Sequence, residues 1–264
     1  MERFDNNGVT SIKGSVGVHG VNMNVYMYLT DGVLIDTGSE SLLSEYIPFF
    51  QAGDYDQVIL THSHEDHTGG ARWIQENRQV PLYIHPMAID ECRADGVYPD
   101  YRKELWGERK AFKAEPLPMT FHSRTSKWQA IHTPGHAEDH LVFLNQESGT
   151  LFSGDLFVAP KLRIVMEQES IAKHIDSLKK VLTYDFEEIY CSHAGYIPNG
   201  KQLLKKKLDQ IVSTQEEIME LHSQGLSSEE INQQLFPREY PLAVISGGEW
   251  DSRHIIRSVI ADNE

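Results

Sequence analysis

The stretch QVILTHSHEDHTGG, residues 57–70, carries the strongest signal in the sequence, because three histidines and two acids follow directly on an apolar run. The run QVIL is typical of a buried strand, and GGARWIQENR at 69–78 is typical of a helix that begins at the glycines. Histidines this close together would repel one another whenever they carried protons. The stretch therefore predicts a strand that ends in a turn whose histidines are held neutral by a partner.

Size and charge narrow the class of protein. The chain has 264 residues, 40% of them hydrophobic, which suffices for one large domain or one domain with an appendage. A formal net charge of -15 argues against a nucleic-acid binder, whose affinity depends on lysines and arginines that contact phosphates. Cys92 and Cys191 form no CxxC pair, so neither a disulfide framework nor a thiolate zinc finger is indicated.

The N-terminal residues MERFDNNGVTSIKGSVG lack the basic and apolar regions of a signal peptide. No window approaches the about 20 apolar residues that a membrane-spanning helix needs. We therefore expect a cytoplasmic protein that has no membrane partner.

Strand-like and helix-like segments alternate over the first 200 residues. NVYMYLTDGVLIDTG (24–38) is typical of a hairpin that turns at Asp31 and Gly32, and SLLSEYIPFF (41–50) is typical of a helix. From Trp128 onwards strand-like runs resume, with one helical pattern among them. The expected strands are PLYIHP (81–86), WQAIHTPG (128–135), DHLVFLN (139–145), TLFSGDLF (150–157) and EEIYCSHAG (187–195), and the expected helix is SIAKHIDSLKKVLT (170–183).

The C-terminal tail has helical periodicity throughout, so we predict a catalytic domain over residues 1–200 and a helical C-terminal appendage over residues 201–264. Ser227 before Glu229 and Glu230 is a capping signal. The basic run KQLLKKKLD (201–209) is typical of a solvated helix face. Residues 95–122 lack a clean period and form an insert that is a candidate lid.

The spacing of the histidines predicts metal ligands. His62 and His64 lie two residues apart at a strand end and can face one way, whereas Asp66 and His67 enter the next turn. Imidazole and carboxylate groups suit zinc and similar divalent ions. Strand ends in α/β layers are where ligands converge. We therefore expect further ligands at the ends of later strand-like runs, namely His136, Asp155 and His193.

The motifs LIDTG, THSHEDHTGG, HTPGHAEDH, FSGDLF and CSHAGY occur in this order, and together they resemble the metallo-β-lactamase superfamily over roughly residues 12–200. Within it, the chain is most similar to the branch of glyoxalase II and β-lactamase-like protein 2, helical tail included. The resemblance implies an α/β fold of the αββα type, in which two sheets lie face to face with helices outside, followed by the helical appendage.

The resemblance also implies a dinuclear centre with two zinc ions per chain, for which Mn²⁺ or Fe²⁺ are alternatives. It assigns His62, His64 and His136 to the first metal, Asp66, His67 and His193 to the second, and Asp155 to a bridge between them. Asp36 of LIDTG would orient a ligand histidine.

The sequence departs from relatives in ways that bear on activity. CSHAG stands where a PGHG-like turn is common, although His193 still falls at the matching place. Flavodiiron relatives carry a glutamate in place of His64, and zinc β-lactamases often carry a cysteine in place of Asp155, so a hydrolytic site of histidine and aspartate alone is favoured. Lactonases place a tyrosine where this chain has Val158.

The resemblance implies a hydrolase in which a metal-bridging hydroxide attacks a small ester, thioester or lactone, while Asp66 orients the hydroxide or protonates the leaving group. A metal-dependent phosphodiesterase or single-strand ribonuclease is the alternative. A third reading is a non-hydrolytic iron redox or metal-binding protein. We expect a small-molecule substrate and predict no oligomeric state.

His140 and His254 are candidates for contact with the substrate, the second because the tail can fold back over the metals. Glu65 is expected to be solvated, and Cys191 is expected to be a buried strand residue.

Overall fold

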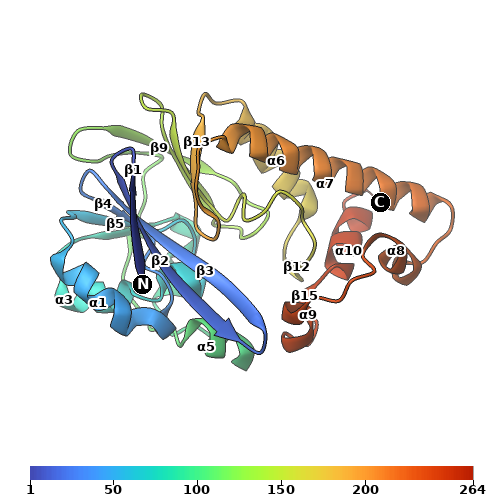
Figure 1. The fold of residues 1–264 in the computed structure, drawn as a ribbon, viewed down its shortest axis with the longest axis horizontal. Coiled ribbons are helices and arrows are strands. Elements are labelled where there is room, and N and C mark those ends of the chain that lie inside the picture. Colours follow the sequence, from blue (N-terminus) through green and yellow to red (C-terminus); the bar gives the residue numbers. More distant parts are fainter. Residues whose placement is uncertain (264) are drawn as a thin grey trace.

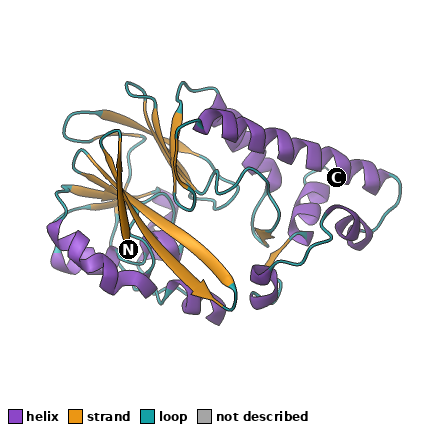
Figure 2. Ribbon diagram, in the orientation of Figure 1, coloured by secondary structure: helices purple, strands orange, loops and turns teal. Residues whose placement is uncertain are grey.

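Two β-sheets lie face to face with helices on their outer sides, and the C-terminal helices extend to one side of this sandwich (Figure 1, Figure 2). We describe residues 1–263 of this computed structural model. The first sheet has its strands in chain order; β1 to β4 pair antiparallel, and β4 to β7 pair parallel. Its strands are β1 (Glu2–Asn6), β2 (Val9–Val18), β3 (Val21–Thr30), β4 (Val33–Ile35), β5 (Gln57–Ile59), β6 (Leu82–Ile84) and β7 (Glu115–Pro116).

The second sheet has the order β14-β13-β11-β10-β9-β8, in which only the β11–β13 pair is parallel. A two-stranded ribbon of β12 and β15 joins the loop after β11 to the C-terminal helical segment, which we call the appendage. The strands are β8 (Thr120–His122), β9 (Lys127–His132), β10 (Leu141–Asn145), β11 (Thr150–Gly154), β12 (Val165–Met166), β13 (Glu188–Cys191), β14 (Gly195–Ile197) and β15 (Trp250–Asp251).

Apolar side chains from both sheets fill the space between them. Tyr28 and Ile59 of the first sheet share a buried cluster with Phe143, Phe152 and Tyr190 of the second sheet. The ring of Tyr28 packs within 5.4 Å of the rings of both Phe152 and Tyr190. This sheet-on-sheet core fixes the distance between the two rows of strand ends, and therefore positions whatever groups those ends carry.

Separate apolar clusters join each sheet to its own helices, which completes the predicted αββα sandwich. Helices α1 (Leu43–Ala52) and α3 (Ala71–Asn77) cover the first sheet, and α6 (Ile171–Leu182) and α7 (Gly200–Ser223) cover the second. The other helices are α2 (Glu65–Thr68), α4 (Ile89–Cys92), α5 (Asp100–Trp106), α8 (Ser228–Leu235), α9 (Pro241–Ile245) and α10 (Arg253–Ala261), with short 3-10 helices at Glu40–Leu42 and Pro86–Ala88.

The C-terminal appendage is helical as predicted, and α7, α8 and α10 share one apolar cluster with the second sheet and α6. Ser227 and Glu230 form the capping box at the start of α8. None of the helices in residues 1–263 combines the length and apolarity needed to cross a membrane.

The hairpin turn between β3 and β4 has Asp31 and Gly32 at positive φ (45° and 79°), as the sequence predicts. The prediction that KQLLKKKLD is a solvated face is wrong for Lys207, which is 2% exposed. Its ammonium group donates to the carbonyl oxygens of Leu156 (3.0 Å) and Phe157 (2.6 Å), because α7 lies directly behind the loop that follows β11.

Candidate metal centre

The side chains predicted as metal ligands meet at one edge of the sandwich, where strands of both sheets end. His62 and His64 follow β5, Asp66 and His67 lie in α2, and the remaining three follow strands of the second sheet. The two sheets thus contribute from opposite sides. The structure places three overlapping groups of ligand atoms within 4.8 Å of one another: His62, His64 and His136; His62, His67 and Asp155; and Asp66, His67 and His193.

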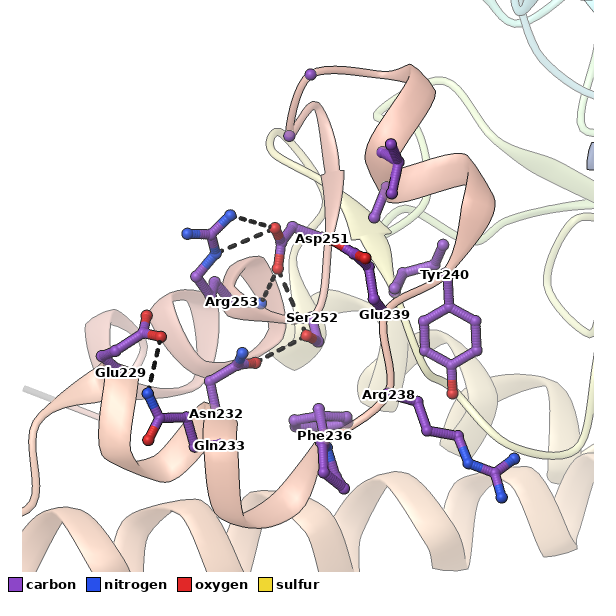
Figure 3. Close-up of a pocket in the computed structure, with 16 residues that line it drawn as sticks. Glu229, Asn232, Gln233, Phe236, Arg238, Glu239, Tyr240, Asp251, Ser252 and Arg253 are labelled. Carbon is purple, nitrogen blue, oxygen red and sulfur yellow. Dashed lines mark hydrogen bonds and ion pairs between the residues drawn. The ribbon is translucent and has the colours of Figure 1, made fainter. Parts of the chain in front are cut away.

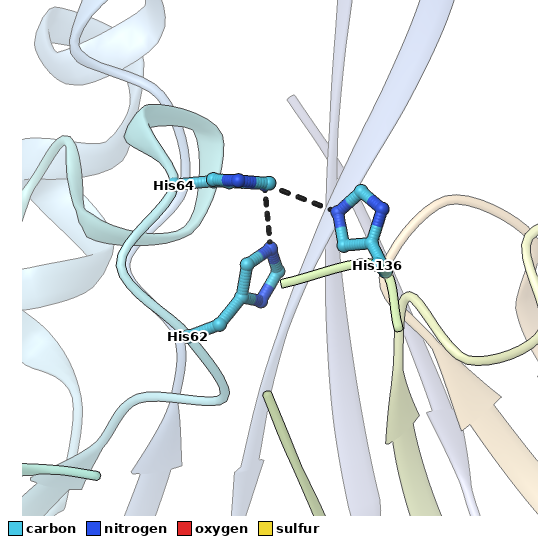
Figure 4. A group of neighbouring side chains, drawn as sticks. All are labelled: His62, His64 and His136. Carbon is cyan, nitrogen blue, oxygen red and sulfur yellow. Dashed lines mark hydrogen bonds between the residues drawn. The ribbon is translucent and has the colours of Figure 1, made fainter. Parts of the chain in front are cut away.

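The first group is a triangle of imidazoles (Figure 4). Nδ1 of His64 lies 3.0 Å from Nε2 of His62 and 3.1 Å from Nε2 of His136. Nitrogen atoms that bind one tetrahedral zinc ion at about 2.05 Å would lie roughly 3.3 Å apart. The triangle therefore has the size that a single divalent cation requires.

The second group has carboxylates among its imidazoles. Oδ2 of Asp155 lies 3.1 Å from Nε2 of His193 and 3.4 Å from Nε2 of His136, so this carboxylate reaches both groups. Nε2 of His67 and Oδ1 of Asp155 lie 3.6 Å apart, and within residues 1–263 neither buried atom has a hydrogen-bond partner. Buried polar atoms without partners are costly, and a cation between them would satisfy both. The donor set therefore fits a metal ion.

Two imidazoles of the first group, those of His62 and His64, are held neutral. The third differs, because Glu169 and Asp155 raise the pKa of His136 against the opposing effect of burial. Burial, reinforced by His67 and His64, holds the pKa of His62 well below its ordinary value. Burial, reinforced by His136 and Arg102, does the same for the pKa of His64. A metal must find imidazole nitrogens without protons, so these two rings are prepared for it.

The second group balances charge differently. Although burial favours the neutral ring, Asp66 and Asp155 raise the pKa of His67 well above its ordinary value. The pKa of His193 is raised by Asp155 and Asp66 against the same effect of burial. A cation bound here replaces protons as the partner of the carboxylates, so metal binding releases protons.

Asp36 fixes the orientation of His67. Its Oδ2 accepts a hydrogen bond from Nδ1 of His67 (2.7 Å), and its Oδ1 accepts one from the Thr61 backbone N–H (2.8 Å). The side chain is fully buried and its backbone lies in the left-handed region, with φ 59°. The carboxylate therefore turns Nε2 of His67 towards Asp155.

Glu169 orients His136 in the same way, although no motif in the sequence points to it. Its Oε2 lies 3.3 Å from Nδ1 of His136, and its Oε1 accepts from the Met166 backbone N–H (2.9 Å). Glu169 precedes the helix cap Ser170 and belongs to none of the five motifs. The only signal in the sequence is an acidic residue at the start of a helix. Such residues are common, and their position does not indicate which side chain they contact.

A glycine and a histidine set the approach of Asp155. Gly154 has φ 48° at a break in the β11 register, and a Cβ there would come within 2.6 Å of Nε2 of His140. That nitrogen accepts the Asp155 backbone N–H (2.9 Å), and Nδ1 of His140 is bonded to Thr133 Oγ1 (2.8 Å). Since both ring nitrogens are engaged and the ring is fully buried, we assign His140 to the support of Asp155 rather than to substrate.

The expectation that Glu65 is solvated is wrong. Glu65 is 3% exposed, and its oxygens accept two hydrogen bonds from Arg102 of α5, at 2.5 and 2.7 Å. The same guanidinium donates to Glu249 of the appendage at 3.0 Å. Arg102 therefore connects the turn that carries the candidate ligands, the insert and the C-terminal appendage.

His254 does not lie beside the candidate ligands. Its Nε2 pairs with the Gly248 carbonyl (2.7 Å) within the appendage, and the ring lines none of the cavities beside the ligands described here. The insert does cover the centre. A cavity of about 30 Å³ above Asp66, Asp155 and His193 is roofed by side chains of α5, namely Tyr101, Arg102, Leu105 and Trp106.

A cleft of about 680 Å³ opens beside this small cavity and is lined by His136, Asp155 and His193. On the other side of His64 and His136 lies a polar cavity of about 370 Å³ that contains Asp139. Burial, with a smaller contribution from Glu91, raises the pKa of Asp139 to about 6.

A further cavity of about 540 Å³ lies between α8, α9 and α10 of the appendage (Figure 3). Its polar groups pair with one another: Arg253 donates to Asp251 Oδ2 (3.0 Å), and Ser252 donates to Asn232 Oδ1 (2.7 Å). No metal ligand reaches it among the residues described.

Comparison with known proteins agrees with this architecture. A family model described as the metallo-beta-lactamase superfamily matches residues 18–193. The chain is 29% identical over 179 residues to a beta-lactamase-like protein 2 homolog of Drosophila melanogaster, covering 64% of this chain and 57% of that protein. It is 26% identical over 203 residues to an atrochrysone carboxyl ACP thioesterase of Aspergillus fumigatus, covering 74% and 58%. The chain thus matches under two thirds of the length of these curated relatives.

Solved structures share the fold at low sequence identity. A beta-lactamase domain protein from Burkholderia ambifaria superposes with a TM-score of 0.73 at 17% identity, over 99% of this chain and 89% of that chain. The superposition includes the helical C-terminal part as well as the sandwich, since nearly the whole chain is covered.

Proposed function

We propose that this chain, which belongs to the metallo-β-lactamase superfamily, is a hydrolase that holds two zinc ions and cleaves a small ester, thioester or lactone. The observation that carries the proposal is the convergence of the seven ligand side chains, with unpartnered atoms of His67 and Asp155 facing each other, next to an open cleft. The relative named as a thioesterase supports the acyl class of substrate.

Divalent metal ions bound here would lower the pKa of a coordinated water and polarise the electrophilic oxygen. The chain's own contribution is orientation and proton transfer. Asp66 lines the small cavity, and its Oδ2 lies 3.4 Å from Nε2 of His193. Its carboxylate is placed to accept a proton from the attacking water and to return it to the leaving group.

The bond changes are those of acyl hydrolysis. A C–O bond forms between the acyl carbon and the water oxygen, and the bond from that carbon to the leaving sulfur or oxygen breaks. One proton of the water ends on the leaving group. Side chains of α5 shield the small cavity on one side, and a substrate bound in the adjacent cleft would displace water from the other side, which strengthens the electrostatic effect of the surrounding charges.

The test is a screen of metal-quantified protein against thioesters, aryl esters, lactones, phosphodiesters and short RNA. We expect turnover of an acyl substrate, and we expect His64→Ala and Asp155→Ala to abolish it and reduce zinc content. His122→Ala and Asp185→Ala are matched controls on the exposed surface. Full activity in His64→Ala, or turnover of RNA alone, would contradict the proposal.

A further inference from the structure

The cleft beside the metal centre has apolar walls from three separate parts of the chain. The loop after β11 contributes Val158 and Leu162, and the appendage contributes Leu242 and Trp250. Met23 of the β3 strand completes the wall. All of these side chains are partly exposed, and a volume of about 680 Å³ lies in the usual range of small-molecule sites. The walls therefore suit an apolar chain rather than a flat polar ligand.

Val158 is held in a strained conformation at this wall. Its φ is 50°, although a β-branched residue rarely adopts the left-handed region, which costs about 1–3 kcal/mol. The side chain is 38% exposed and lies three residues after Asp155. Strain of this kind concentrates at functional sites, so Val158 is a candidate contact for the substrate.

Two cations without acidic partners line the same cleft. The side chains of Lys161 and Arg163 are exposed, and neither forms an ion pair with any carboxylate of residues 1–263. The Arg163 guanidinium lies 5.9 Å from the ring centre of Tyr240, which also lines the cleft. In a chain of net charge -15, two unpaired cations beside an apolar cleft would attract an anionic ligand.

We propose that the cleft binds an acyl thioester whose thiol carries phosphate groups, with the acyl chain against Val158, Leu242 and Trp250. The phosphates meet Lys161 and Arg163, since a guanidinium fork and an ammonium group together match several phosphate oxygens. This assignment rests on the proposed function, because the thioester is one of the substrates proposed there. A neutral ester or lactone would leave both cations without a partner.

The binding test uses thioethers, which cannot be hydrolysed. Calorimetry on the full chain would compare S-octyl-coenzyme A with S-octyl-N-acetylcysteamine, which lacks the phosphates. We expect the coenzyme A compound to bind about tenfold more tightly or better at low salt, and this advantage to shrink in about 0.5 M NaCl. Equal affinity of the two compounds would overturn the assignment, as would tighter binding of S-octylglutathione, whose anions are carboxylates.

Variants locate the two parts of the site. We call the ratio of the affinities for S-octyl-coenzyme A and S-octyl-N-acetylcysteamine the phosphate advantage. Lys161→Ala/Arg163→Ala should bring this ratio close to one. Lys113→Ala/Lys206→Ala removes the same charge from exposed positions outside the cleft and should leave the ratio unchanged. Leu242→Trp should weaken S-octyl-coenzyme A without weakening S-methyl-coenzyme A. Val158→Trp is a second blocking variant at a side chain that is already exposed. An undiminished phosphate advantage in the first double variant contradicts the assignment.

The two proposals fail separately. If S-octyl-coenzyme A binds as expected but zinc-loaded protein leaves octanoyl-coenzyme A intact, the proposed function is wrong and the cleft assignment stands. If octanoyl thioesters are hydrolysed with no preference for the phosphate-bearing form and no tighter binding, the cleft assignment is wrong and the hydrolase proposal stands.

Discussion

Replacing Arg102 with methionine removes the one cation that contacts Glu65 and Glu249 together. The Arg102 side chain is only 12% exposed, and the Glu65 side chain is 3% exposed. Breaking a buried ion pair by removing one partner costs about 3–5 kcal/mol, because the remaining charge is left without compensation. We therefore expect Arg102→Met to lose about that much unfolding free energy.

A double-mutant cycle separates this cause from lost packing. If the unpaired carboxylate dominates, adding Glu65→Gln to Arg102→Met should restore about 2 kcal/mol, whereas Glu65→Gln alone should destabilise. The control is Arg93→Met, which breaks the exposed pair with Asp90 and should cost under about 1 kcal/mol.

Urea unfolding followed by tryptophan fluorescence measures these differences, and zinc content and turnover report on the metal-binding turn. We expect Arg102→Met to lose activity as well as stability, since Glu65 lies between His64 and Asp66. A loss under 1 kcal/mol, or a double variant that is less stable than Arg102→Met, would refute the reasoning.

Three further predictions concern the surroundings of the ligands. Asp36→Ala should weaken metal binding about 10- to 100-fold, measured by competition with a chromophoric chelator; unchanged affinity would contradict the orienting role. Glu169→Gln should lower zinc affinity less than Asp36→Ala, because Gln still accepts from Nδ1 of His136, whereas Glu169→Ala should lower it more than Glu169→Gln. Asp139→Asn should stabilise the metal-free protein by up to ~3 kcal/mol at pH 7.5. The Asp139 carboxyl has a pKa of about 6 in the folded chain and 3.8 as its ordinary value, so the folded chain binds this proton more tightly than the unfolded chain. The wild-type protein therefore loses stability as the pH rises from about 4 through 6. In urea unfolding that gain should vanish near pH 4, and a gain independent of pH would contradict the burial argument.

The sequence was sufficient for the sandwich and for the groups that cluster locally. His62, His64, Asp66 and His67 lie within six positions at a strand end, so their proximity follows from the chain itself. The later ligands could be placed because strand ends meet at one edge. The structure brings all of them together, whereas their roles with metal remain the proposal made above.

The buried contacts that could not be predicted from the sequence are those between residues far apart along the chain. Arg102 pairs with Glu65 across 37 positions and with Glu249 across 147, and nothing in their spacing points to a contact. Lys207 was assigned to a solvated face because a run of lysines has the same pattern whether or not one of them is buried. A single charged residue in a sequence does not indicate which residue it pairs with. A buried ion pair can therefore be identified only once the positions of both elements in the fold are known.

Contacts between segments that are far apart in the sequence also bear on substrate specificity. The candidate ligands come from the sandwich, but the cleft walls are completed by Leu242 and Trp250 of the appendage. Arg102 connects the appendage, through Glu249, to the turn that carries His64 and Asp66. A change in how the appendage packs would therefore alter both the substrate wall and the support of Glu65, which neighbours two ligands. Relatives that keep the ligand motifs while their C-terminal helices differ should consequently differ in substrate before they differ in metal chemistry, because loops and appendages carry the contacts that the shared sandwich does not.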